Sequence, residues 1–198
     1  MTPFDFLVDS YRTERLKILS LWAQVPAEQM TFRPEPRARS PLEHMVHQCL
    51  SEDAWMTNML GVVVDGAALP ADETRDAFIA HYGAASAARA EQLARQSAEW
   101  FSAPVRFFDV ERSRAWVLTR RMTHSAHHRG QLTVYFRLWG LPLYSTYGPT
   151  ADTGGLAKNG ATVVYYPTDG PAPPLPGPGD APVSERATAL PTEMNTAQ

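Results

Sequence analysis

Four long stretches of this chain carry apolar residues at helical spacing, and strand-like patterns are scarce. The stretches expected to be helical are residues 2–23, 41–60, 72–100 and 111–139. The second has the strongest start signal, because Ser40 and Glu43 form a potential capping box around Pro41. The fourth is expected to end at Gly140. Long helices that must each bury an apolar face favour an all-α fold, here an antiparallel four-helix bundle.

The ends of these segments carry further signals. Thr2 is expected to be the N-cap of the first helix, with Pro3 in its first turn. Residues 26–39 are expected to form a loop. Residues 103–110 are ambiguous, because their alternating Val and Phe residues also suit a short extended segment.

The C-terminal part of the chain has a different composition. Residues 141–166 are rich in Tyr, Thr and Gly and are expected to be irregular but able to pack on the helices. Residues 167–198 hold eight of the seventeen prolines and few large apolar side chains. Such a segment buries too little surface to offset its loss of conformational entropy. We therefore predict one helical domain over residues 1–155 and an extended or disordered, irregular extension over residues 156–198.

Charge and composition limit the partners of the chain. Eighteen basic and twenty-one acidic residues in 198 give a net charge of −3, and no Lys/Arg run indicates a nucleic-acid interface. No segment has the length and apolarity of a membrane span or a signal peptide. The only cysteine, Cys49, lies on the apolar face of its helix, so a buried thiol is expected. We predict a cytoplasmic protein that acts on a small molecule and binds neither nucleic acid nor membranes.

Histidines cluster on two of the predicted helices. His124 and His128 are four residues apart, so they project from one helix face, as two ligands of a single metal ion do. Both flank the apolar stripe of the fourth helix, whereas His127 points away from it. On the second helix His47 lies nearer the stripe than His44, although the difference is small. Side-by-side packing of the two helices would assemble a three-histidine site.

Two familiar metal chemistries are excluded by the sequence. A zincin requires H-E-x-x-H, but Ser125 follows His124 here. A di-iron bundle requires paired E-x-x-H motifs, and no glutamate of this chain has a histidine three residues later. Glu43, one turn before His47, could orient that histidine or relay a proton, but its position favours helix capping.

Three motifs together resemble the DinB/YfiT-like superfamily of metalloenzyme-like proteins. They are S-P-x-E-x-x-x-H over 40–47, H-x-x-x-H-R-G-Q over 124–131, and Tyr-Gly-Pro-Thr-Ala-Asp over 147–152. The resemblance covers roughly residues 4–155. It implies an antiparallel four-helix bundle, often dimeric, with a divalent metal bound by His47, His124 and His128. A homodimer is therefore expected.

The resemblance also implies a chemistry. Related members transfer or isomerise groups with the help of low-molecular-weight thiols, so metal-dependent activation of a thiol is the expected function. Three imidazole ligands leave coordination positions open, as in catalytic sites. Imidazole suits zinc, nickel, iron and copper, with zinc, nickel or iron expected here. Metal-dependent hydrolysis and a non-catalytic, stress-related metal-binding role are the alternatives, and the sequence supplies no clear general base for hydrolysis.

Overall fold

Most of the described chain is helical. The computed structural model describes residues 2–155, 158 and 160–176. Its helices are α1 (Asp5–Gln24), α2 (Pro41–Trp55), α3 (Arg75–Ala94), the short α4 (Ala98–Ser102) and α5 (Arg114–Leu138). A 3-10 turn, η1 (Ala27–Gln29), follows α1, and a π-helical turn, η2 (Met56–Leu60), continues α2. The strands β1 (Pro104–Phe107) and β2 (Val110–Ser113) pair as an antiparallel hairpin.

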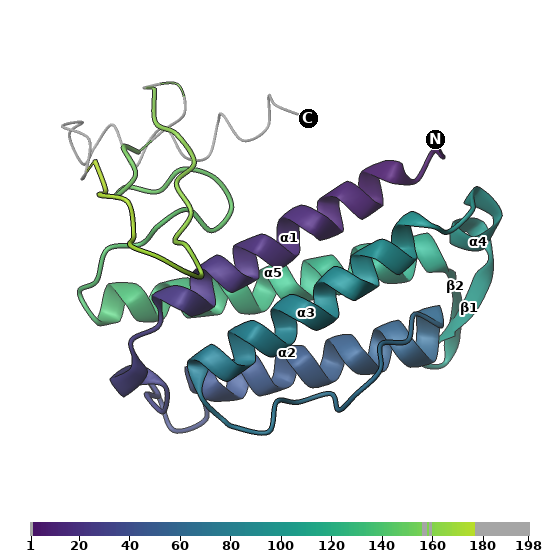
Figure 1. Ribbon diagram of the computed structural model, residues 1–198, viewed down its shortest axis with the longest axis horizontal. Helices are drawn as coiled ribbons and strands as arrows, with labels where there is room; N and C mark the ends of the chain where they lie inside the picture. Colours follow the sequence, from purple (N-terminus) through teal and green to yellow (C-terminus); the bar gives the residue numbers. More distant parts are fainter. Residues whose placement is uncertain (1, 156–157, 159, 177–198) are drawn as a thin grey trace.

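The four longest of these helices lie side by side (Figure 1). α1 packs against α3 and α5, and α2 packs against α5 and α3. Residues 61–74 return along the length of the molecule before α3 begins, so α2 and α3 run in the same direction (Figure 1). The predicted helical class is confirmed, whereas the antiparallel arrangement is not confirmed for this pair. α2 and α5, which carry the clustered histidines, do run in opposite directions.

The start of α2 forms as its sequence predicts. The Ser40 hydroxyl accepts a hydrogen bond from the Glu43 backbone N–H at 3.3 Å, and the Glu43 carboxylate accepts one from the Ser40 N–H at 2.7 Å. This capping box fixes where α2 begins. In α1, by contrast, Thr2 is not the N-cap. Its hydroxyl hydrogen-bonds to Asp5 at 2.7 Å, and the helix begins at Asp5 with Phe4 as the N-cap.

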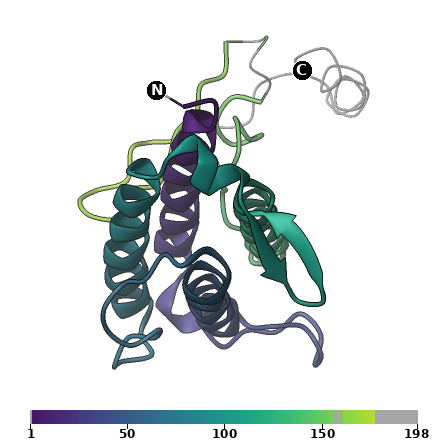
Figure 2. The same cartoon turned by 90° about the vertical axis from the view of Figure 1, so that its right-hand side faces the viewer.

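The predicted third helix is interrupted. It ends at Ala94, and Ser97 starts the separate helix α4 by accepting a hydrogen bond from the Trp100 N–H at 3.2 Å. A serine hydroxyl competes in this way with the continuing helix for backbone donors. The ambiguous segment that follows forms β1, and residues expected to open the fourth helix form β2. Figure 2 shows the resulting hairpin standing beside the helices.

The core has two apolar parts. One part surrounds Trp22, Met45, Phe78 and Phe136, and the other surrounds Met56, Leu93, Phe101 and Leu118. Buried charged side chains that join helices α2, α3 and α5 make contact with tyrosines from both parts. No helix in the described part of the chain combines the length and apolarity needed to cross a bilayer.

The segment after α5 is irregular and packs on the helices, as expected. The Tyr166 N–H donates to the Ser20 hydroxyl of α1 at 2.8 Å, and the Ser145 N–H donates to the Val164 carbonyl at 2.8 Å. Tyr144 donates to the Pro173 carbonyl at 2.7 Å. These contacts tie Tyr166 to α1, and Val164 and Pro173 to the irregular segment that follows α5. The rest of the predicted extension, residues 177–198, lies outside the described residues, and the domain boundary at 155 stays a prediction.

Candidate metal site

Three histidines of two helices converge on one point. The Nε2 atom of His124 lies 3.3 Å from Nε2 of His47 and 3.2 Å from Nε2 of His128. One ring nitrogen from each histidine lies within 4.8 Å of the other two. His47 comes from α2, and the other two come from successive turns of α5. The antiparallel contact of these helices thus assembles the cluster that the sequence predicts.

The spacing of the three nitrogens suits a small divalent cation. Ligands at 2.0–2.1 Å in a tetrahedron lie roughly 3.3–3.4 Å apart. Two of the nitrogen pairs match that distance within about 0.2 Å. His128 is buried, whereas His47 and His124 are half-buried. A fourth ligand could therefore approach from the side of His47 and His124.

Gln131 holds His128 in the tautomer that a metal ligand needs. The Gln131 Oε1 atom lies 2.7 Å from Nδ1 of His128 and accepts its hydrogen. The lone pair of His128 is then on Nε2, which faces the other two histidines. A hydrogen bond to the distal nitrogen is the usual support of a ligating histidine. The signal was available in the sequence, because Gln131 is three residues after His128 and shares its helix face.

Arg121 binds the outer nitrogen of His124. Its Nη1 atom lies 3.0 Å from His124 Nδ1 and 2.8 Å from the Ser51 hydroxyl. A guanidinium can only donate, so this contact places the proton of a neutral His124 on Nε2. Ligation of a metal through Nε2 requires that proton to move to Nδ1 or to leave. Binding of a cation through Nε2 would therefore be linked to loss of the Arg121–His124 contact.

The surroundings of all three rings favour the uncharged form. Burial is the largest cause in each case, and it lowers the pKa of His124 to about 3 and that of His128 to about 4. The neighbouring Arg121 cation adds to the lowering of the pKa of His124. Burial also lowers the pKa of His47, with the Arg39 cation as the next cause. Neutral imidazoles have the free lone pairs that metal ligands require.

A buried charge network lies beneath the cluster. Glu52, which is 1% exposed, lies 3.5 Å from the Arg89 guanidinium and 3.6 Å from that of Arg121. Tyr11 and Tyr82 donate to its two carboxylate oxygens at 2.6 and 3.0 Å. Sequence reasoning missed this network. Glu52 and Arg121 do occupy positions on the apolar stripes of their helices, which is the signal that could have revealed them.

The remaining histidines lie outside the cluster. His127 is exposed, as predicted. His44 is more buried than its helical position suggested. Its ring packs 5.4 Å from that of His128, its Nδ1 atom has no hydrogen-bond partner, and burial lowers its pKa to about 4. It borders a small cavity, also lined by Gln48 and Ser125. The Nε2 atom of His81 lies 3.1 Å from the backbone carbonyl oxygen of Ala68.

Other residues singled out in the sequence have structural contacts. Cys49 is buried, and burial raises the pKa of its thiol to about 12, so it remains protonated. Glu43 is engaged in the capping box and in an ion pair with Arg33. Arg129, next to His128, binds Glu14 of α1 at 2.6 Å. Asp152 accepts from the Leu143 N–H at 2.8 Å and closes the turn after α5.

Comparison with known proteins gives a family and a fold. The model of the DinB family matches residues 2–155. The crystal structure of a DinB-like protein from Bacillus cereus is similar with a TM-score of 0.61 at 19% identity, over 71% of this chain and 95% of that chain. The crystal structure of a DinB-like protein from Bacillus subtilis is similar with a TM-score of 0.53 at 17% identity, over 70% of this chain and 97% of that chain. No curated protein matched the sequence.

Proposed function

This chain belongs to the DinB family, and on that basis we propose that His47, His124 and His128 hold one divalent cation that activates a low-molecular-weight thiol for transfer to a small electrophile. The observation that carries the proposal is the convergence of three Nε2 atoms at distances suited to tetrahedral ligation. Zinc, nickel and iron are the candidate metals, since all accept imidazole ligands.

The residues of the cluster fit such an ion. Three neutral imidazoles bring no negative charge, so a bound cation would keep its full charge and lower the pKa of a thiol or water in an open position. Gln131 orients His128, and the side chain of His47 remains accessible from solvent. Burial of His128 and the packing of α2 on α5 keep the two helices and their ligands in place.

The surrounding charges support a thiol in preference to hydrolysis. The cluster of potential ligands contains no carboxylate. The candidate base singled out in the sequence, Glu43, is occupied by Ser40 and Arg33, and its hydrogen bonds and the Arg33 cation lower its pKa. Arg39 is exposed, and no ion pair of the described residues includes it. A free cation close to the histidines suits a thiol that carries acidic groups.

The proposal is tested by measuring thiol conjugation with and without bound metal. Protein loaded with zinc, nickel or iron should accelerate the reaction of a small thiol with an electrophile, followed by loss of free thiol. A chelator, or the variant His128→Ala, should remove the acceleration. A rate that persists after chelation contradicts the proposal. Hydrolysis of an ester without any thiol would favour the hydrolase, and metal binding without activity would favour the non-catalytic role. We further propose that the protein acts as a cytoplasmic homodimer.

A further inference from the structure

Aromatic side chains form a continuous wall beside His124. The Trp55 ring lies 5.6 Å from the His124 ring at an interplanar angle of 30°. Phe107 and Phe108 of the hairpin meet Trp55 edge-on at 5.2 and 6.2 Å, and Trp116 packs on Phe107 at 5.0 Å. We define Trp55, Phe107, Phe108 and Trp116 as the aromatic wall. It connects the hairpin at one end of the molecule to the histidine cluster.

The outer part of the wall is open to solvent. Phe108 is 63% exposed and Trp116 is 40% exposed. A ring as exposed as that of Phe108 forgoes most of the free energy that its burial would contribute. The inner part is different, because Trp55 is half-buried and its ring faces both His124 and the Arg121 guanidinium, 5.8 Å away. The wall therefore leads from open surface to the metal ligands.

Phe108 also has a backbone conformation that its side chain disfavours. Phe107 pairs with Val110, so Phe108 and Asp109 form the two-residue loop of the hairpin. The φ angle of Phe108 is +52°, the only positive value among the described residues other than glycine. Hairpin loops place glycine at such positions, because a Cβ atom is strained there. A bulky residue in this conformation is characteristic of sites where function outweighs local stability.

We propose that the aromatic wall is the subsite for an apolar, preferably aromatic, group of the small molecule that reacts at the histidine cluster. This substrate class rests on the proposed function for the reacting end of the molecule and on the wall itself for the apolar end. Phe108 covers the apolar group from the outer side, and Trp55 positions it next to His124.

The test compares two thiols as probes, one with a phenyl group where the other has a methyl group. Phenylmethanethiol and ethanethiol are titrated into cobalt-loaded protein, and binding is followed by the sulfur-to-cobalt absorption band. The wild type should bind the aromatic thiol about tenfold more tightly, as expected for added aromatic contacts. In Phe108→Gly this preference should fall to nearly one. The same variant should melt at the same or a higher temperature, because glycine removes the strain at φ +52°.

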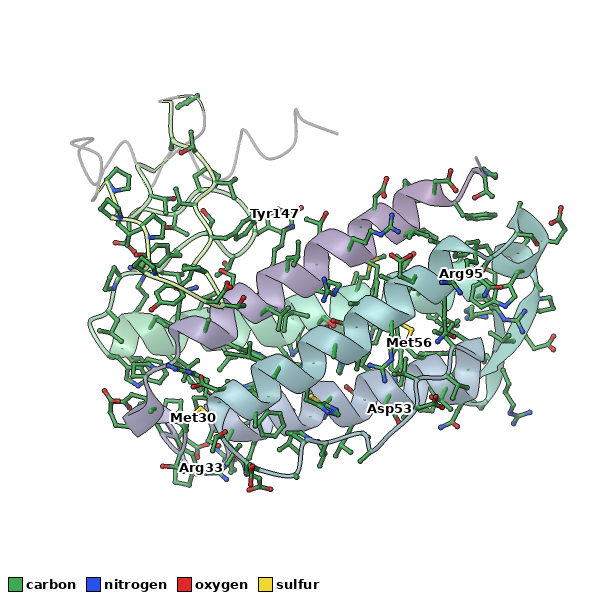
Figure 3. All side chains as sticks on the ribbon, in the orientation of Figure 1. Met30, Arg33, Asp53, Met56, Arg95 and Tyr147 are labelled. Carbon is green, nitrogen blue, oxygen red and sulfur yellow. The ribbon has the colours of Figure 1, made fainter. Side chains whose placement is uncertain are left out.

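Tyr147→Gly is the matched control. Tyr147 is an exposed aromatic residue of an irregular segment, 73% exposed, and lies above α1 away from the hairpin (Figure 3). This variant should keep the tenfold preference of the wild type. Equal affinities of the wild type for the two thiols would overturn the proposal. So would a loss of stability in Phe108→Gly with the preference intact, since Phe108 would then be structural.

A second arm separates the subsite from the metal. Metal-free protein is titrated with 2-phenylethanol, and the indole N–H signal of Trp55 is followed by NMR. The signal should shift in the wild type and in Tyr147→Gly, but not in Phe108→Gly. If cobalt fails to bind, the proposed function fails while this arm still decides the subsite. An unshifted Trp55 signal in the wild type would then overturn the subsite as well.

Discussion

Replacing Gln131 by alanine should weaken metal binding without disturbing the fold. The Gln131 side chain is exposed, and its Oε1 atom accepts the Nδ1 hydrogen of His128 at 2.7 Å. Without that acceptor the ring can rotate and the proton can move to Nε2, where it blocks ligation. Loss of such a supporting hydrogen bond lowers metal affinity about 10- to 100-fold, which corresponds to about 1.4–2.7 kcal/mol.

The same site offers a control of opposite sign. Gln131→Glu places a carboxylate at the Nδ1 hydrogen, and a charge-assisted hydrogen bond should raise the affinity above that of the wild type. The assay is competition for zinc against a chromophoric chelator at pH 7.5, with circular dichroism to monitor helix content. Zinc binding by Gln131→Ala as tight as that of the wild type would contradict this role of Gln131. Weaker binding by Gln131→Glu than by Gln131→Ala would contradict it as well.

Further predictions concern the ligands, pH, buried charge and assembly. His124→Ala should abolish stoichiometric metal binding but retain the helical circular dichroism spectrum, and unfolding of this variant would indicate a structural site. Metal affinity should fall on acidification at a lower pH than it would for free histidines, because burial lowers the pKa of all three ligands, that of His128 to about 4. An affinity that already falls above pH 6.5 would contradict this. Because the pKa of these histidines is lower in the folded than in the unfolded protein, the metal-free protein should lose stability below pH 6.5, where histidines of the unfolded chain take up protons and the folded ones do not. Denaturant midpoints measured from pH 7 to 4 test this. Glu52→Gln should lower the free energy of unfolding by about 3 kcal/mol, since it leaves the buried Arg121 guanidinium without its counter-charge, while Arg89 keeps its ion pair with Asp53. Glu91→Gln, in an exposed pair with Arg12, should lower it by less than about 1 kcal/mol. Sedimentation at micromolar concentration should show a dimer formed through the faces of α1 and α5, and a monomer alone would contradict that assembly.

Local signals in the sequence predicted some helix boundaries and missed others. The capping box at Ser40 and Glu43 involves groups three residues apart, so the start of α2 could be recognised directly. Ser97 also caps a helix, but no strong pattern marks it within a long alanine-rich segment, and the break between α3 and α4 was missed. The hairpin was predicted only as one ambiguous segment, because β2 pairs through backbone groups while its side chains are mostly exposed.

The histidine cluster was predictable because spacing on a helix limits where side chains point. His124 and His128 share a face by their four-residue separation, and the motifs of the family selected His47 as the third member. The structure places these three together. The contacts of Glu52 with Arg89 and Arg121 were not predicted, since they depend on how three helices are packed. Helical position likewise underestimated the burial of His44, which depends on the ring of Tyr135 from α5.

The central claim is that His47, His124 and His128 together bind one divalent cation. Protein purified without a metal-affinity tag and crystallised with zinc allows the most direct measurement, anomalous diffraction on either side of the zinc absorption edge. One peak per chain is expected between the three histidines, roughly 2.0–2.1 Å from each Nε2 atom. The claim would be contradicted if no peak appeared there while zinc sites elsewhere in the crystal were fully occupied. It would also be contradicted if the zinc ion were bound by His44 or His127 in place of one of the three.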